Sequence, residues 1–148
     1  MNMDYKVGEV AMTYKSSTPK QYKVTTADDA YRLMLNSYDE GQLEYRESFK
    51  VVLLNNNCDV LGYATISEGG LTETTVDVRM ILQVALLTNA TAMILVHNHP
   101  SGNLTPSRQD RELTKHVVDA SRLMNIRVID HIIISTSNYN SFAENGLI

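Results

Sequence analysis

The stretch AMILVHNHPSGNLTPSRQD, residues 92–110, decides the fold, because it joins an apolar run to a polar loop and a helix start. Residues 92–96 are wholly apolar, which is typical of a central strand covered on both faces. The prolines and glycine that follow predict a loop. Ser107 is expected to cap a long helix that runs to about residue 124. Strand, loop and helix in this order indicate an α/β unit.

The segments on either side of this stretch carry alternating strand and helix signals. Hydrophobic spacing and caps predict helices over residues 27–36 and 78–89, strands over 47–54, 60–66 and 127–135, and a final turn near 141–144. A hairpin at residues 55–57 would join the first two strands. Together these elements predict an α/β fold in which a mixed β-sheet is sandwiched between helices.

Length and composition describe an ordinary globular chain. With 148 residues, 43% of them hydrophobic, we expect one domain over residues 26–148, preceded by an N-terminal arm over residues 1–25. The formal net charge of -4 argues against tight non-specific binding to nucleic acid. The single cysteine, Cys58, excludes an intramolecular disulfide and a Cys-x-x-Cys zinc site. We found neither a signal peptide nor an apolar run near the roughly 18 residues of a membrane span, which predicts a cytoplasmic protein without membrane contact.

Two histidines and a carboxylate are spaced so that they can share one ion. His97 and His99 are two residues apart at a strand end, so both imidazoles face the same side. Ser107 and Asp110 are three residues apart at a helix start and share a helix face. Because a strand end and the following helix start are neighbours in such a sheet, the sequence predicts a divalent metal site with one coordination position open.

A plainer interpretation of the same residues stays open. Ser107-x-x-Asp110 is also a variant of the capping box, which stabilises a helix without any metal. A His-x-His pair also occurs by chance. Capping and metal binding are compatible, because one helical turn can serve both.

The motif from His97 to Asp110 resembles the JAMM motif of the JAB/MPN+ metalloproteases. The longer run HNHPSGNLTPSRQD (97–110), with DHIII (130–134) and Ser141-Phe142, is similar to the RadC branch of that family. The resemblance covers roughly residues 26–148. It implies a JAB/MPN architecture, which is cytidine-deaminase-like.

The resemblance also implies a mechanism. One zinc ion per chain would be bound by His97, His99 and Asp110, with a water in the fourth position. Glu47 would be the general base and then the proton donor to the leaving amine, and Ser107 would stabilise the oxyanion. Glu44 is the competing candidate for the base.

Several other residues attract attention. His131 is expected to be structural or to support a metal ligand rather than to be a fourth ligand, and His116 is expected at the surface or in packing. A basic stripe on the predicted helix is either a contact surface for DNA or an acidic partner, or a solvated face, which we favour; it consists of Arg108, Arg111, Lys115 and Arg122.

Three functions follow from these observations. The first is a zinc-dependent peptidase or isopeptidase that acts on a protein or peptide substrate. The second is a DNA-repair-associated or DNA-binding protein of the RadC type with a structural metal, and the third is a metal-binding scaffold without turnover. Longer RadC-like proteins carry an N-terminal helical region, whereas only a short arm is seen here, which favours a stand-alone catalytic domain. The sequence has no insertion like those with which eukaryotic relatives of the family bind ubiquitin. We therefore do not expect a deubiquitinase role.

Overall fold

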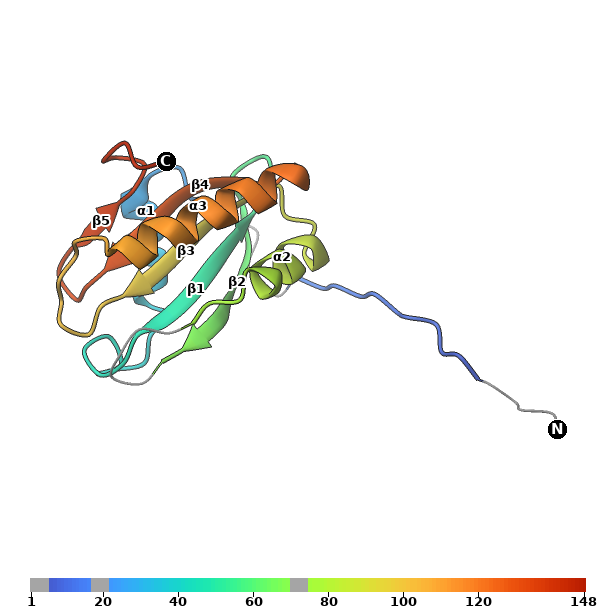
Figure 1. Cartoon of the computed structure of the whole chain (residues 1–148), viewed down its shortest axis with the longest axis horizontal. Coiled ribbons are helices and arrows are strands. Elements are labelled where there is room, and N and C mark those ends of the chain that lie inside the picture. The colour runs from blue at the N-terminus through green and yellow to red at the C-terminus, as the bar shows by residue number, and fades with distance from the viewer. Residues whose placement is uncertain (1–5, 17–21, 70–74) are drawn as a thin grey trace.

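A five-stranded mixed sheet forms the centre of the molecule (Figure 1). The computed structural model describes residues 6–16, 22–69 and 75–148. The elements follow one another as α1 (Ala27–Leu35), β1 (Ser48–Leu54), β2 (Val60–Glu68), α2 (Val78–Leu87), β3 (Ala92–Asn98), α3 (Arg108–Leu123), β4 (Arg127–Ile134) and β5 (Tyr139–Ser141). This confirms the expected α/β class and mixed sheet.

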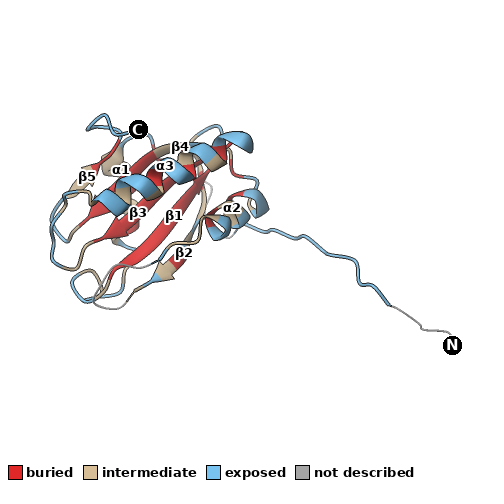
Figure 2. Ribbon diagram, viewed as in Figure 1, coloured by how far each residue is buried: buried red, intermediate tan, exposed pale blue. Residues whose placement is uncertain are grey.

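The order of strands across the sheet is β2-β1-β3-β4-β5, so β3 lies in the middle. β1 pairs antiparallel with both β2 and β3, while β3 and β4 are parallel and are connected through α3. β5 closes the far edge antiparallel to β4. Every residue of β1 and β3 is buried, which explains why residues 92–96 are apolar without alternation (Figure 2).

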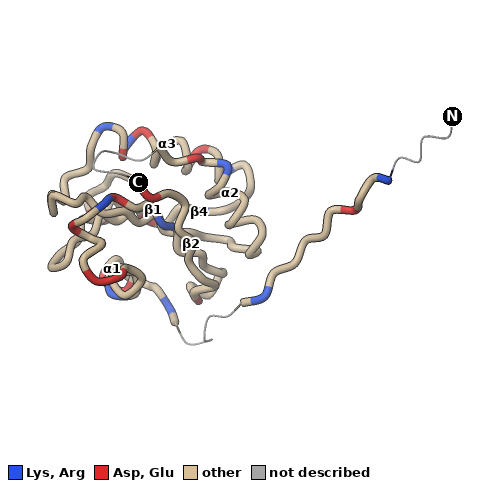
Figure 3. The backbone as a smooth tube through the Cα atoms, turned by 90° about the horizontal axis from the view of Figure 1, so that it is seen from below, with Lys and Arg blue, Asp and Glu red and all other residues tan. Residues whose placement is uncertain are grey.

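Helices cover both faces of the sheet, with α1 on one side and α2 and α3 on the other (Figure 3). Successive side chains of a strand point to opposite faces, so β1 and β3 contribute to two separate cores. The core beneath α2 and α3 includes Phe49, Val51, Leu53, Ile81, Ala85, Met93, Leu95 and Val117. The core beneath α1 includes Ala30, Met34, Val52, Leu54, Ile94, Val96, Ile132 and Ile134.

Some boundaries differ from the sequence-based expectation. β3 continues through Asn98 and β2 through Glu68 because each is paired along its length with a neighbour. α2 ends at Leu87 because Asn89 takes a positive φ of 56°, which stops a right-handed helix. β5 was not expected; its last residue, Ser141, donates a hydrogen bond from Oγ to Asp130 Oδ2 at 2.6 Å, a contact set by tertiary structure.

The described part of the predicted N-terminal arm, residues 6–16 and 22–25, contains almost no regular structure. Residues 6–16 form neither helix nor strand, and Lys23 forms a single antiparallel bridge with Asp59. Among the described residues no helix has the length and hydrophobicity needed to cross a membrane.

The central strand should dominate the stability of the fold. Leu95 is fully buried in β3, so we expect Leu95→Ala to lower the free energy of unfolding by about 2–5 kcal/mol, through lost burial and the cavity left behind. Leu123 is 83% exposed at the end of α3, and Leu123→Ala should change the same quantity by less than about 0.5 kcal/mol. Urea denaturation of the two variants measures both values, and equal destabilisation would contradict the assignment of the core.

Candidate metal centre

Four side chains from three separate elements meet at the carboxyl end of β3. His97 lies in β3 and His99 directly after it, Asp110 lies in the first turn of α3, and Glu47 immediately precedes β1. Glu47 arrives there because β1 runs antiparallel to β3 and Phe49 is paired with His97. One potential ligand atom from each of the four side chains lies within 4.8 Å of all the others.

The distances between potential ligand atoms in this group are short enough for the side chains to contact one ion. Nε2 of His97 lies 3.0 Å from Nε2 of His99 and 3.1 Å from Oδ1 of Asp110. Nε2 of His99 lies 3.2 Å from Asp110 Oδ2, and Glu47 Oε1 is 3.9 Å from His97 Nε2. His97 and Glu47 are buried, while His99 and Asp110 are partly open to solvent. The structure therefore brings the three predicted ligands and the predicted base together at one partly accessible position.

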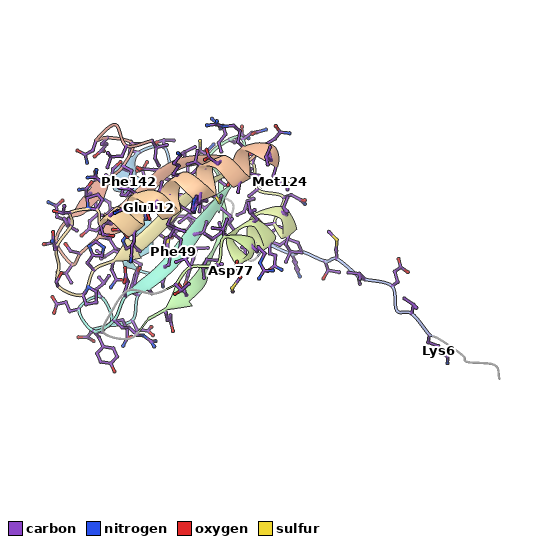
Figure 4. The ribbon with its side chains drawn as sticks, in the orientation of Figure 1. Lys6, Phe49, Asp77, Glu112, Met124 and Phe142 are labelled. Atoms are coloured by element: carbon purple, nitrogen blue, oxygen red, sulfur yellow. The ribbon has the colours of Figure 1, made fainter. Side chains whose placement is uncertain are left out.

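Two aromatic rings, Phe49 and Phe142, pack against the buried histidines of this region (the two phenylalanines are labelled in Figure 4). Phe49 stacks on the imidazole of His97 with ring centroids 6.0 Å apart and meets His131 edge-on. Phe142 stacks on His131 at 4.5 Å. These rings keep water away from one side of the histidines and so strengthen electrostatic interactions there.

A hydrogen-bond chain determines which nitrogen of His97 carries its proton. The hydroxyl of Thr114 donates to the carbonyl of Asp110 at 2.6 Å, so His131 Nδ1, 2.6 Å away, must donate to that hydroxyl. Burial holds the pKa of His131 well below its usual value, so this ring is neutral and its Nε2 is an acceptor. His97 Nδ1, 2.7 Å from that atom, is then the donor, which leaves the lone pair of His97 Nε2 facing the centre.

His99 is oriented in a simpler way. Its Nδ1 lies 2.6 Å from the carbonyl oxygen of Asn103, which can only accept a hydrogen bond. Nδ1 is therefore the donor, and the lone pair of the neutral ring is on Nε2, facing Asp110. Both imidazoles thus present the nitrogen that a metal ligand requires.

Asp110 serves the helix cap and the centre together. Its Oδ2 accepts from the backbone N–H of Ser107 at 2.7 Å, and the Ser107 hydroxyl accepts from the Asp110 N–H at 3.0 Å. Burial opposes the charged form of Asp110, but the hydrogen bonds and positive charge that His97 and His99 supply when Nε2 also carries a proton outweigh it and hold the pKa of this carboxyl below its usual range. The capping box is present, and it leaves Oδ1 directed at His97.

The other residues singled out in the sequence lie elsewhere or act indirectly. Glu44 is exposed, outside the four-residue group, and lines a pocket of about 170 Å³ with His99 and Pro100. His131 supports His97, as expected, and His116 is exposed. The basic stripe of α3 is exposed and interspersed with acidic residues, one of which, Glu112, pairs with Arg108 at 2.8 Å (Figures 3 and 4).

Sequence reasoning missed Thr114 and Asn103. Thr114 lies four residues after Asp110, so helical spacing places it on the same face, one turn farther on. Asn103 contributes only a backbone carbonyl, for which a side-chain pattern carries no signal.

Replacing Thr114 should weaken metal binding without touching a ligand. In Thr114→Val the acceptor for His131 Nδ1 is lost while the shape is kept, so we expect the Zn²⁺ affinity to fall by about tenfold or more. Thr114→Ser keeps the hydroxyl and should bind Zn²⁺ like the wild type. Competition with a chromophoric chelator measures both affinities, and equally tight binding by Thr114→Val would contradict the orienting chain.

Zn²⁺ binding should depend on pH through His99. Its hydrogen bond to Asp110 raises the pKa of His99 above the usual 6.5, despite opposing burial. The proton stabilises the metal-free folded protein at low pH and is lost as pH rises through the raised pKa. Because a bound metal ion must displace it, the apparent affinity should increase with pH and level off only once the pH exceeds the raised pKa of His99, which lies above 6.5. Chelator competition across this range checks the trend, and an affinity independent of pH would disprove it.

Comparison with known proteins identifies the family. Residues 24–147 match the RadC-like JAB domain family. A UPF0758 protein of Flavobacterium johnsoniae is 39% identical over 128 residues, covering 86% of this chain and 55% of that protein. A UPF0758 protein of Desulforamulus reducens is 47% identical over 103 residues, covering 70% of this chain and 45% of its own length.

A third relative is similar over a larger share of its own length. The UPF0758 protein YeeS of Escherichia coli is 44% identical over 103 residues, which is 70% of each chain. The chain thus spans about half the length of the first two relatives and 70% of the length of the third. The residue pattern from His97 to Asp110, the mixed sheet and these matches agree, and the chain belongs to the RadC-like JAB domain family.

Proposed function

We propose that the protein is a zinc-dependent metallopeptidase or isopeptidase that hydrolyses an amide bond in a protein or peptide substrate. The observation that carries this proposal is the buried carboxylate of Glu47, 3.9 Å from His97 Nε2 beside three side chains of metal-ligand type. A purely structural metal site is usually closed by four ligands and has no need of an adjacent base.

The residues present fit a catalytic zinc. His97 Nε2, His99 Nε2 and Asp110 would hold one ion per chain, and three protein ligands leave a coordination position for water or substrate. Nitrogen and oxygen donors suit zinc and also iron, cobalt or manganese, among which we propose zinc. When bound, the ion would make a water acidic enough to attack at neutral pH and would polarise the substrate carbonyl.

Glu47 and Ser107 would carry out the proton transfer and the hydrogen-bond donation that the reaction needs. Glu47 would accept the proton of the attacking water and pass it to the nitrogen of the departing amine. The Ser107 hydroxyl accepts a hydrogen bond in the helix cap, so its own hydrogen is not used by that bond and would be donated to the oxyanion. Phe49 would exclude competing water from the buried side.

The alternative is a DNA-associated protein with a structural metal. Its support is the basic stripe on α3, but Arg108 is paired with Glu112 and the formal net charge is -4. A DNA affinity that depends steeply on salt and is lost in Arg111→Ala and Lys115→Ala would favour this alternative.

Glu47→Gln should reduce hydrolysis to a small residual rate while leaving the metal in place. The amide keeps the size of the side chain but cannot accept the proton, so we expect the rate to fall by about a hundredfold or more. A panel of quenched fluorescent peptides and isopeptides, with zinc content measured in parallel, tests this. Chelation should remove the activity, and added zinc should restore it.

Glu44→Gln is the matched control, since this exposed carboxylate lies outside the four-residue group. It should retain wild-type activity. Loss of activity in Glu44→Gln with retention in Glu47→Gln would reverse the assignment of the base, and a zinc-loaded wild type that cleaves none of the panel would count against the peptidase proposal.

A further inference from the structure

Between the two histidines lies a fully buried asparagine that takes no part in the four-residue group. Asn98 points to the opposite face of the sheet from His97 and His99, because successive side chains of a strand alternate. Its amide nitrogen donates to the carbonyl of Leu43 at 2.8 Å and to the carbonyl of Arg46 at 2.9 Å. Its amide oxygen accepts from the backbone N–H of Ser48 at 2.9 Å.

These bonds hold the backbone on both sides of Glu47. The carbonyl of Arg46 immediately precedes Glu47, and the N–H of Ser48 immediately follows it. The carbonyl of Glu47 itself accepts from the N–H of Gly69 at 2.8 Å. The backbone that carries the candidate base is therefore fixed by one side chain of β3 and by the chain just beyond β2.

The Asn98 amide takes the place of backbone hydrogen bonds between β1 and β3. Backbone pairing between β1 and β3 ends at Phe49 and His97. One position farther, the Asn98 side chain continues the connection toward residues 36–47, a long loop between α1 and β1. Residues at the end of such a loop are otherwise prone to local opening.

Only an amide of this length meets the three backbone groups. Two carbonyls need two donors and one N–H needs an acceptor, which is the hydrogen-bonding inventory of an asparagine side chain. An aspartate would set a carboxylate oxygen against two carbonyl oxygens, and an apolar residue would leave three backbone groups without this partner, among them the buried N–H of Ser48.

We propose that Asn98 is a positioning residue for Glu47: its amide holds the Arg46–Ser48 backbone so that the Glu47 carboxylate lies against His97. This inference rests on the proposed role of Glu47 as the base. It links the two halves of the centre, since one run of three residues at the end of β3 presents two proposed metal ligands on one face and secures the proposed base from the other.

The first experiment is a double-mutant cycle on hydrolysis by the zinc-loaded protein. Asn98→Ala and the milder Asn98→Ser should lower kcat by about tenfold or more with little change in KM, because the base is displaced while substrate binding is not. In the Glu47→Gln background the same substitutions should lower kcat by less than about twofold, because a residue that acts through Glu47 then has nothing to position. An equal loss in both backgrounds would overturn the proposal.

The second experiment needs no activity. Amide hydrogen exchange of the zinc-loaded protein should speed up by about tenfold or more at Gly69 in Asn98→Ser, because its acceptor, the Glu47 carbonyl, is released. Exchange at Leu95 in β3 should stay at the wild-type rate, and zinc content should remain one per chain. Unchanged exchange at Gly69 would overturn the proposal even if the variant were inactive.

Lys50 supplies the matched control. It is a buried polar residue of β1 that secures the far end of the same loop, where its ammonium donates to the Ser37 carbonyl at 2.8 Å. Lys50→Met should leave Gly69 exchange and kcat near the wild-type values. If Lys50→Met reproduced the Asn98 effects, the loop as a whole rather than Asn98 would position Glu47, and the proposal would be wrong.

The two proposals fail separately. If the zinc-loaded wild type cleaves none of the panel, that counts against the peptidase function, while hydrogen exchange still decides whether Asn98 holds Glu47. If the wild type is active and Gly69 is unaffected in Asn98→Ser, the positioning role fails and the peptidase function stands.

Discussion

The alternation of side chains at the end of β3 is the constraint on which the centre depends. His97 and His99 face α3, and between them Asn98 faces the loop before β1, so one short backbone run orients groups on both faces of the sheet. Neighbours on both sides hold this run, with β1 antiparallel and β4 parallel to it. A shift of β3 by one residue would exchange the ligands with the asparagine, and the buried strand pairing makes such a shift costly.

Elements that stabilise the fold also hold in place the four-residue group that could bind a metal ion. The capping box of α3 fixes Asp110 in the first turn, and Thr114 one turn later closes the chain that orients His131 and His97. The potential ligand atoms are thus held in place by helix, strand and packing. A pre-formed group of this kind loses little conformational freedom on binding, which favours both affinity and a defined geometry.

The location of the centre follows from topology. Ligand sites in open α/β sheets form beyond the carboxyl ends of parallel strands, and the β3-α3-β4 unit places the helix start there. The antiparallel strand β1 adds what a parallel neighbour could not, because its beginning rather than its end meets the end of β3. Glu47, just before β1, reaches the histidines for that reason.

The amino-acid sequence by itself determined the fold class, most element positions and the side chains that gather at the centre. Apolar residues 92–96, the Ser107 cap and the His97–Asp110 spacing are local signals, because strand and helix periods dictate which side chains share a face. Only the tertiary structure showed that Glu47 and not Glu44 lies beside the histidines, brought in Thr114 and the Asn103 carbonyl, ended α2 early and added β5. Those outcomes depend on strand register and on contacts between residues far apart in the chain, which no local pattern encodes.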